Sequence, residues 1–261
     1  MKKGVLLATL VILLWASVPV NAALWDRGGG LIYDDVLDIT WLQDANYANT
    51  TGYDDALYGT NTGGKMEWDD AMTWADNLAY YDSVRDVTWD DWRLPRILPV
   101  NGSTYNNATS YDGSTDVGYN ISAPGSAYPG STASEMAYMF FNNLGNLAYY
   151  PVDYPTSPAP QTGWGLQNTS FQSGGMGGPT VSFQNLANTY YWSGTEHNTD
   201  PTRARYFHFN LGYQSDMGKD SSYLAWAVRG GDVAAVPVPA AVWLLASGLT
   251  GLVGIRRRFD R

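Results

Sequence analysis

The clearest prediction of the fold comes from the segment Tyr223-Leu224-Ala225-Trp226-Ala227-Val228-Arg229, near the C-terminal end of the chain. Small residues and Arg229 alternate there with large apolar residues, which is the period-two pattern of a β-strand with two chemically different faces. Two further strands are predicted shortly before it, at residues 190–193 and 206–210. The main domain is therefore expected to close with three strands.

Another strand-forming region lies at the start of the domain. Residues 31–33 and 39–42 are mostly apolar, and the acidic segment 34–38 between them is turn-prone. Two short strands joined by a tight connection are predicted.

Two helices are predicted between these strand regions. The first covers residues 68–78, where apolar residues recur at helical spacing and acidic residues occupy the first turn. The second begins near Thr132, whose spacing to Glu135 fits a capping box. The expected buried stripes are Ala71, Trp74, Ala75 and Leu78 in the first helix and Ala137, Phe140, Phe141 and Leu144 in the second. A hairpin, two helices and three closing strands indicate an α+β fold.

Three stretches are predicted to be loops. Residues 44–64 and 151–178 are rich in Gly, Asn or Pro, and residues 99–130 are dominated by Asn, Gly, Ser, Thr and Tyr with little periodicity. The stretch 99–130 is interpreted as a long surface insertion.

The N-terminal residues 1–22 have the features of a secretory signal peptide. Lys2 and Lys3 precede an apolar run at residues 5–15, and Val20 and Ala22 occupy the small-residue positions before a cleavage site. Cleavage is therefore expected between Ala22 and Ala23, with export by the secretion machinery.

Residues 236–261 have the features of a membrane anchor. The motif that contains Val236, Pro237 and Pro239 is followed by 16 uncharged residues, 240–255. This is shorter than the roughly 20 residues usual for a spanning helix. Three arginines follow, and the positive-inside rule predicts that they stay cytoplasmic: Arg256, Arg257 and Arg258. A short C-terminal transmembrane helix is predicted.

This order of motif, short apolar helix and arginine cluster resembles the PEP-CTERM sorting signal. Val238 stands where the name-giving version of that signal has Glu. The resemblance implies an exosortase-type processing enzyme as partner. It also implies transient anchoring in the inner membrane, and then delivery to the cell surface or the extracellular matrix.

The composition of residues 23–235 excludes several classes of protein. Once the ends are set aside, 9 basic and 24 acidic residues remain, a net charge of −15. Such a surface repels nucleic acid. The chain has no cysteine, which excludes disulfide scaffolds, cysteine nucleophiles and cysteine-bound zinc. It is rich in rings, with 11 Trp and 19 Tyr.

Five short motifs in residues 23–235 resemble the Lcl C-terminal domain in their order along the chain. They are Leu31-Ile32-Tyr33-Asp34, Trp68-Asp69-Asp70-Ala71, Trp92-Arg93-Leu94-Pro95, Tyr191-Trp192-Ser193-Gly194-Thr195 and Trp226-Ala227-Val228-Arg229. The resemblance implies a C-type-lectin-like domain with long loop insertions that binds sulfated polysaccharides. The stretch 99–130 departs from that family, in which a helix directly follows the third motif.

Two of these motifs are also similar to formylglycine-generating enzymes, which need cysteines that this chain lacks. We therefore interpret them as fold landmarks, in which Trp side chains fill the core and Arg93 or Arg229 binds buried carbonyls or carboxylates.

Several acidic clusters leave calcium binding open, although solvated turns are the favoured interpretation. These clusters are Asp34 with Asp35 and Asp38, Asp54 with Asp55, and Asp90 with Asp91. No other cofactor is expected, and the identity of any metal ligands stays unknown. A ligand-binding site is predicted at Trp192, Glu196, Asp216 and Asp220, where carboxylates and a ring occur together.

Catalytic residues are not assigned, because His197 and His208 are the only imidazoles and no recognised catalytic motif contains them. The favoured hypothesis is a non-enzymatic module that binds extracellular polysaccharide or matrix. A purely structural matrix component and an enzyme with a carboxylate-based site are the alternatives.

Overall fold

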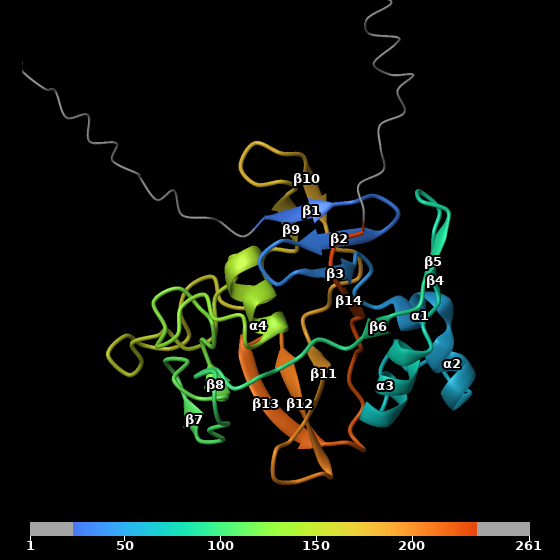
Figure 1. Ribbon diagram of the computed structural model, residues 1–261. Helices are drawn as coiled ribbons and strands as arrows, with labels where there is room; N and C mark the ends of the chain where they lie inside the picture. Colours follow the sequence, from blue (N-terminus) through green and yellow to red (C-terminus); the bar gives the residue numbers. More distant parts are fainter. Residues whose placement is uncertain (1–22, 234–261) are drawn as a thin grey trace, which may run out of the picture.

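The computed structural model describes residues 23–233, which form a mixed, sheet-rich α+β fold. Figure 1 shows one five-stranded sheet above a second one, with helices α1–α3 on one side and α4 with long loops on the other. The predicted signal peptide and the C-terminal sorting signal lie outside the described residues. Between residues 23 and 233, no helix has the length and apolarity needed to cross a membrane.

The first sheet contains the predicted hairpin. Its strand order is β1-β2-β3-β14-β6, and all its pairs are antiparallel. Leu31 pairs with Leu42, so the hairpin prediction is confirmed. The strands are β1 (Leu24–Asp26), β2 (Leu31–Asp34), β3 (Ile39–Leu42), β6 (Trp92–Arg93) and β14 (Val228–Gly230).

The second sheet has the order β11-β12-β13-β8-β7, and it corrects the prediction that residues 99–130 are only a surface loop. Val117 and Ile121 of this stretch are buried, and β8 pairs with β13. The strands are β7 (Thr109–Ser110), β8 (Val117–Tyr119), β11 (Tyr190–Glu196), β12 (Arg203–His208) and β13 (Tyr213–Gly218).

Two small antiparallel hairpins complete the strands. One consists of β4 (Tyr80–Asp82) and β5 (Val87–Trp89), and the other of β9 (Ser170–Gln172) and β10 (Thr180–Ser182). The second hairpin interrupts the predicted loop 151–178, whose remaining residues are mostly turns and irregular chain.

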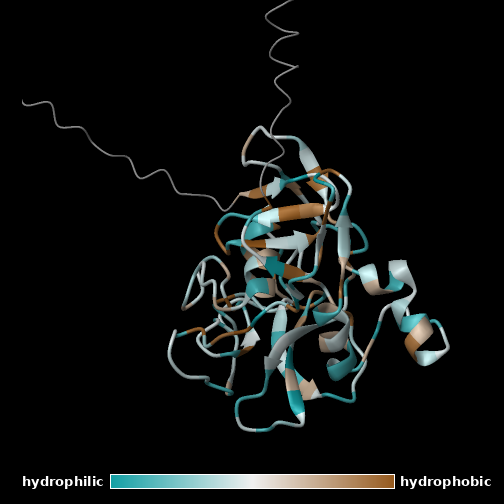
Figure 2. Ribbon diagram, turned by 45° about the vertical axis from the view of Figure 1, so that its right-hand side comes forward, coloured by the Kyte–Doolittle hydropathy of each residue, from teal (hydrophilic) through white to brown (hydrophobic). Residues whose placement is uncertain are grey.

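The strand alternation sorts side chains into two hydrophobic cores. Trp226 and Val228 enter the first core, whereas Ala225 and Ala227 enter the second. Regular pairing in this segment is limited to β14, but the predicted alternation of faces is present. The same division separates Ile32 from Leu31, Trp41 from Leu42, Tyr191 from Trp192 and Phe207 from Tyr206. Figure 2 shows strongly hydrophobic residues on the strands of the first sheet, with much of the surrounding loop pale or teal.

The first predicted helix is confirmed as α3 (Trp68–Asp76), whose predicted stripe is buried. The second is a short α4 (Glu135–Tyr138) that continues into the π-helix η1 (Met139–Asn143), and its stripe is buried too. The predicted capping box is wrong. Ser134 is the N-cap and accepts a hydrogen bond from the Ala137 N–H. The Glu135 carboxylate instead binds Arg93, a partner distant in sequence.

Residues 44–64 are not the continuous loop that was predicted, because they contain α1 (Tyr47–Thr51) and α2 (Tyr53–Tyr58). Gly52 and Gly59 end these helices in the left-handed region, with φ of 68° at both. The buried Asp54 carboxylate accepts the Gly64 N–H and holds the following loop against α2. Helices this short depend on such tertiary contacts for stability.

Candidate functional site

Trp192, a predicted ligand-binding residue, lies in the second core with none of its surface exposed. Its indole N–H donates to the Met66 carbonyl at 3.0 Å. In this position the ring contributes to packing and cannot stack on a ligand at the surface.

The other three predicted ligand-binding residues lie in the second sheet, near the edge at which β11 and β13 end. Glu196 forms an ion pair with Lys219, and Asp216 binds the Arg203 Nε at 2.5 Å. Asp220 is exposed in the turn after β13. Two of the three carboxylates are therefore already paired with cations, and Trp192 is not beside them at the surface.

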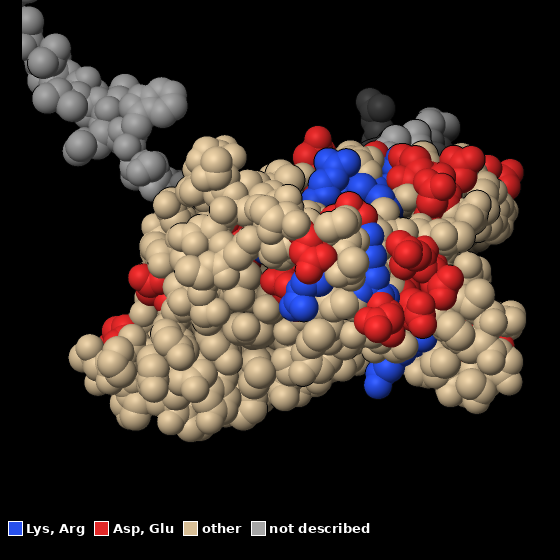
Figure 3. Space-filling view, turned by 90° about the horizontal axis from the view of Figure 1, so that it is seen from below, with Lys and Arg blue, Asp and Glu red and all other residues tan. Residues whose placement is uncertain are grey.

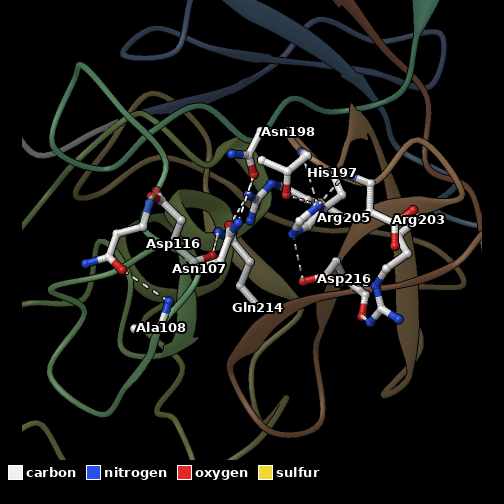
Figure 4. A network of polar contacts seen from close by, with 12 residues as sticks. Asn107, Ala108, Asp116, His197, Asn198, Arg203, Arg205, Gln214 and Asp216 are labelled. Atoms are coloured by element: carbon white, nitrogen blue, oxygen red, sulfur yellow. Dashed lines mark hydrogen bonds and ion pairs between the residues drawn. The ribbon is translucent and has the colours of Figure 1, made fainter.

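Figure 4 shows the polar network that includes Asp216 and centres on Arg205. The Arg205 guanidinium is fully buried and lies 4.3 Å from the centre of the Tyr105 ring. Its Nη2 donates to the Oδ1 atoms of Asn107 at 2.7 Å and Asn198 at 3.2 Å. Burial lowers the pKa of Arg205, because the charged form loses water.

The two remaining nitrogens of Arg205, Nε and Nη1, have no hydrogen-bond partner in the described part of the chain. The Gln214 Oε1 is buried and unpartnered as well. No carboxylate hydrogen-bonds to Arg205 in the described residues. The carboxylates of Asp116 and Asp216 favour its charged form only from a distance, and this attraction does not outweigh the loss of water. Burial of the Arg205 charge in the second sheet therefore lowers the stability of the folded chain.

The two histidines of the chain lie in different surroundings. His208 stacks on Tyr190 at 3.8 Å between ring centres, and burial lowers its pKa to about 4. The His197 Nε2 lies 4.0 Å from the Asp216 carboxylate, and its Nδ1 accepts the Asp200 N–H. His208 is thus neutral at physiological pH, and His197 belongs to a turn.

In the first two predicted acidic clusters, carboxylates of Asp34, Asp35 and Asp54 accept backbone N–H groups. Asp34 is fully buried and accepts hydrogen bonds from the Leu37 N–H and the Asn143 amide, so it is not a solvated turn residue. Within residues 23–233 no group of three or more His, Asp or Glu side chains is placed to hold a metal ion.

The prediction that Arg93 or Arg229 binds a buried carboxylate is confirmed for Arg93, whereas the carboxylate that Arg229 binds is exposed. Arg93 donates to both oxygens of Glu135, at 2.8 and 2.7 Å, and thereby joins β6 to α4. Arg229 binds Asp91 at 2.7 and 3.0 Å and lies 4.1 Å from the centre of the Trp89 ring.

A different group of side chains forms a candidate binding surface, which we call the tyrosine surface. Its rings come from residues 111–119, from the loop 149–164 and from the start of β13. Neighbouring ring centres are 4.6–5.8 Å apart. The tyrosine surface consists of Tyr111, Tyr119, Tyr149, Tyr150, Tyr154, Trp164 and Tyr213.

These rings are held at the surface by two amide side chains beneath them. The Asn120 Nδ2 donates to the carbonyls of Tyr111 at 2.6 Å and Tyr150 at 2.9 Å. The Gln161 Nε2 donates to the carbonyls of Ala148 and Tyr150. The chain around Tyr150 is thereby tied to residues 111–120 on one side and to Gln161 on the other.

The tyrosine surface is partly exposed, and the charged residues next to its rings in sequence, Asp112 and Asp153, are acidic. Tyr111 is 38 % exposed, and the other rings are half-buried. The sequence contains no Lys or Arg between Arg96 and Arg203. On the face seen from below in Figure 3, most charged side chains gather on one side, and the side that carries the long loops has few.

Several hydroxyl groups on this surface have no partner among the described residues and could bind a ligand. Burial, followed by the neighbouring tyrosines, raises the pKa of Tyr119 to about 12. Within residues 23–233 the hydroxyls of Tyr111, Tyr149 and Tyr150 form no hydrogen bond. Phenol groups can both donate and accept, as sugar hydroxyls do.

A pocket of about 210 Å³ lies beside the tyrosine surface. Asn120 and Gln161 line it together with Phe141, Leu147 and Val152. The N–H groups of both amides already bind backbone carbonyls, so the amide oxygens are what remains to accept a hydrogen bond.

Sequence reasoning missed this site because it placed the ligand in the last third of the chain and treated the tyrosine-containing stretches as loops. One signal was available, which is the recurrence of Tyr in a stretch without Lys or Arg. Comparisons with protein-family models, with curated proteins and with solved structures find no match to this chain.

Proposed function

We propose that this chain is a non-enzymatic, exported module that binds a polysaccharide through the tyrosine surface. The observation that carries the proposal is a group of contacting, half-exposed rings with free hydroxyls in a stretch of sequence without Lys or Arg. Rings of this kind offer large apolar contact area together with polar tips. Tyr loses little conformational entropy on binding, because it has only two side-chain torsions.

The expected ligand is a neutral polysaccharide. Sugar rings present C–H faces that pack on aromatic rings, and their hydroxyls match the free phenols and the amide oxygens of the adjoining pocket. The resemblance to the Lcl domain implies sulfated ligands, which need cationic partners. Since no Lys or Arg occurs between Arg96 and Arg203, this surface favours an uncharged glycan.

We further propose that the module has a C-type-lectin-like fold and is sorted to the cell surface or extracellular matrix by an exosortase-type system. The packing of the five motifs supports the fold. Trp68, Trp92 and Trp192 enter one core, while Arg93 and Arg229 bind carboxylates at its border. The sequence of the two ends supports the sorting.

The test is glycan binding by the processed chain. A broad glycan array and affinity electrophoresis in dextran, mannan, alginate and dextran sulfate would be run with and without calcium. Binding to a neutral polysaccharide is expected, and Tyr111→Ala should weaken it about tenfold, which equals 1.4 kcal/mol. The matched control is Tyr81→Ala, an exposed tyrosine on the β4–β5 hairpin.

Three other outcomes would favour a charged ligand, a structural role or an enzymatic role instead. Retention only in alginate or dextran sulfate would refute the neutral-glycan class. No binding to any glycan, while deletion of the chain weakens matrix cohesion, would support a structural component. Turnover of a glycan that is abolished by one Asp or Glu substitution would support an enzyme.

A further inference from the structure

The first described residue of the chain is held by a carboxylate. The Ala23 backbone nitrogen lies 2.9 Å from Asp35 Oδ1, and Ala23 is only 9 % exposed. The other carboxylate oxygen, Oδ2, accepts the Trp25 indole N–H at 3.1 Å. The Asp35 N–H donates back to the Ala23 carbonyl at 3.3 Å. Asp35 therefore binds both ends of the same residue.

This contact anchors an edge strand. β1 pairs with β2 alone within the first sheet, with Leu24 opposite Asp34. The other end of β1 is held by Arg27, whose guanidinium binds both carboxylate oxygens of Asp232. An edge strand of three residues has few backbone hydrogen bonds, and apart from β2 it is bound by Ser173 and Gly174 of the β9–β10 hairpin. The contacts at its two ends therefore form a large share of what holds it.

The predicted signal cleavage site lies at this nitrogen. Cleavage between Ala22 and Ala23 converts an amide N–H into an α-ammonium group, which carries a full positive charge and three donors. The nitrogen does not have to move to meet a carboxylate oxygen at hydrogen-bond distance. Charge-assisted hydrogen bonds of this kind are about twice as strong as neutral ones.

We propose that Asp35 is a preformed binding site for the α-ammonium group of the processed chain, so that removal of the signal peptide locks β1 onto the sheet. The site takes a primary ammonium at the end of a chain. It distinguishes a chain that begins at Ala23 from one that is longer by even one residue.

The surroundings favour a cation at this position. Asp34 and Asp35 lie next to each other at the end of β2, and Tyr138 of α4 faces both. Burial and these two carboxylates raise the pKa of Tyr138 to about 12, so Tyr138 stays neutral. The Arg27–Asp232 pair at the opposite end of β1 is internally balanced. An ammonium at Ala23 would therefore lie at hydrogen-bond distance from the Asp35 carboxylate.

The sign of the pH dependence follows from this pairing. An ordinary α-amino group has a pKa of about 7.7–8.0, and an ion pair raises that pKa in the folded state. The resulting stability is fully present below about pH 7.7, and it is lost as the pH rises through the folded-state pKa.

The test compares three forms of the processed chain in mild detergent: residues 23–261 beginning at Ala23, the same chain with one Gly before Ala23, and the Asp35→Asn variant. Each is released from a cleavable fusion, and intact mass confirms its first residue. Amine-labelling rates between pH 6 and 10, with Lys65 and Lys219 as internal references, give the pKa of the α-amino group.

We expect a pKa at least one unit higher for the chain beginning at Ala23 than for the other two. Its unfolding equilibrium constant in urea at pH 7 should be about tenfold smaller, a difference of 1.36 kcal/mol that disappears by pH 10. Equal labelling rates in the Ala23 and Gly-extended chains would refute the proposal. So would an exported protein whose first residue is not Ala23.

Discussion

Two buried groups with opposite pKa shifts make a specific prediction about stability in acid. Burial raises the pKa of Asp34 from 3.8 to about 6, although three hydrogen bonds to its carboxylate oppose the shift. Burial lowers the pKa of His208 from 6.5 to about 4. Both groups prefer to be neutral in the folded protein, because the charged form loses water there.

The two shifts act on stability in opposite directions between pH 4 and 6. Folded Asp34 keeps its proton to higher pH than the unfolded chain, so its contribution is full below pH 3.8 and is lost as the pH rises through 6. Folded His208 resists protonation, so its contribution is full above pH 6.5 and is lost as the pH falls to 4. At 1.36 kcal/mol per unit, each amounts to about 3 kcal/mol, and the two nearly cancel.

Removing either group by substitution should show how the other group alone makes the free energy of unfolding depend on pH. Asp34→Asn keeps an acceptor for the Leu37 N–H. Its new amide replaces the oxygen that accepts from Asn143 Nδ2, so the Asn143 amide has to turn over to present its unpartnered Oδ1. His208→Phe keeps the stack on Tyr190. In four other carboxyl groups, hydrogen bonds lower the pKa by more than burial raises it, so their contribution to stability is lost only below pH 3.8. These groups are Asp54, Asp82, Asp112 and Asp200. They therefore do not act in this range.

The assay is urea unfolding followed by tryptophan fluorescence at pH 4.5, 5.5 and 6.5. The free energy of unfolding of the wild-type chain should be nearly constant. In Asp34→Asn it should fall by about 1.4 kcal/mol for each unit of acidification, and in His208→Phe it should rise by about the same amount. In the double variant the free energy of unfolding should again be nearly constant over this pH range. Profiles of both single variants that run parallel to the wild type would refute the reasoning.

Three further substitutions test the packing. Glu135→Gln should lower the free energy of unfolding by about 2 kcal/mol in urea, because it leaves the Arg93 charge without its carboxylate; a loss below about 0.5 kcal/mol would contradict the structural role. Arg205→Met should leave that free energy unchanged or raise it by about 1 kcal/mol, since it removes a buried charge with two unpartnered nitrogens, and a loss above about 3 kcal/mol would speak against this. Gly118→Ala should cost at least about 2 kcal/mol and abolish glycan binding. Its φ is 133° and a Cβ would overlap the Ser110 carbonyl of β7, whereas Gly125→Ala, where the space is open, should cost less and keep binding.

The parts of the fold that were predictable are those that depend on local period. Alternation in residues 223–229 assigned Trp226 and Ala227 to different faces, and the structure places them in different cores. Helical spacing identified α3 and its buried stripe. These patterns are reliable because the backbone geometry of a strand or helix fixes which residues share a face, independently of the segments packed against it.

Contacts between distant segments were not predictable in the same way. Glu135 has the spacing of a capping-box residue, but a charge-assisted pair with Arg93 is stronger than the local bond and determines its position. The stretch 99–130 lacks periodicity, yet β8 joins the second sheet because β13 offers an unpaired edge. Local sequence does not encode which edge is free.

The same distinction applies to the candidate site. Sequence alone identifies an acidic, cysteine-free chain that is rich in Tyr and Trp and has the features of an exported protein at both ends. Whether a given ring fills a core or faces water depends on the side of the sheet that another segment covers. Trp192 is covered by Met66 and the second core, while Tyr111 and Tyr150 are gathered at the surface by Asn120. That choice depends on long-range closure of the chain, and only the tertiary structure contains it.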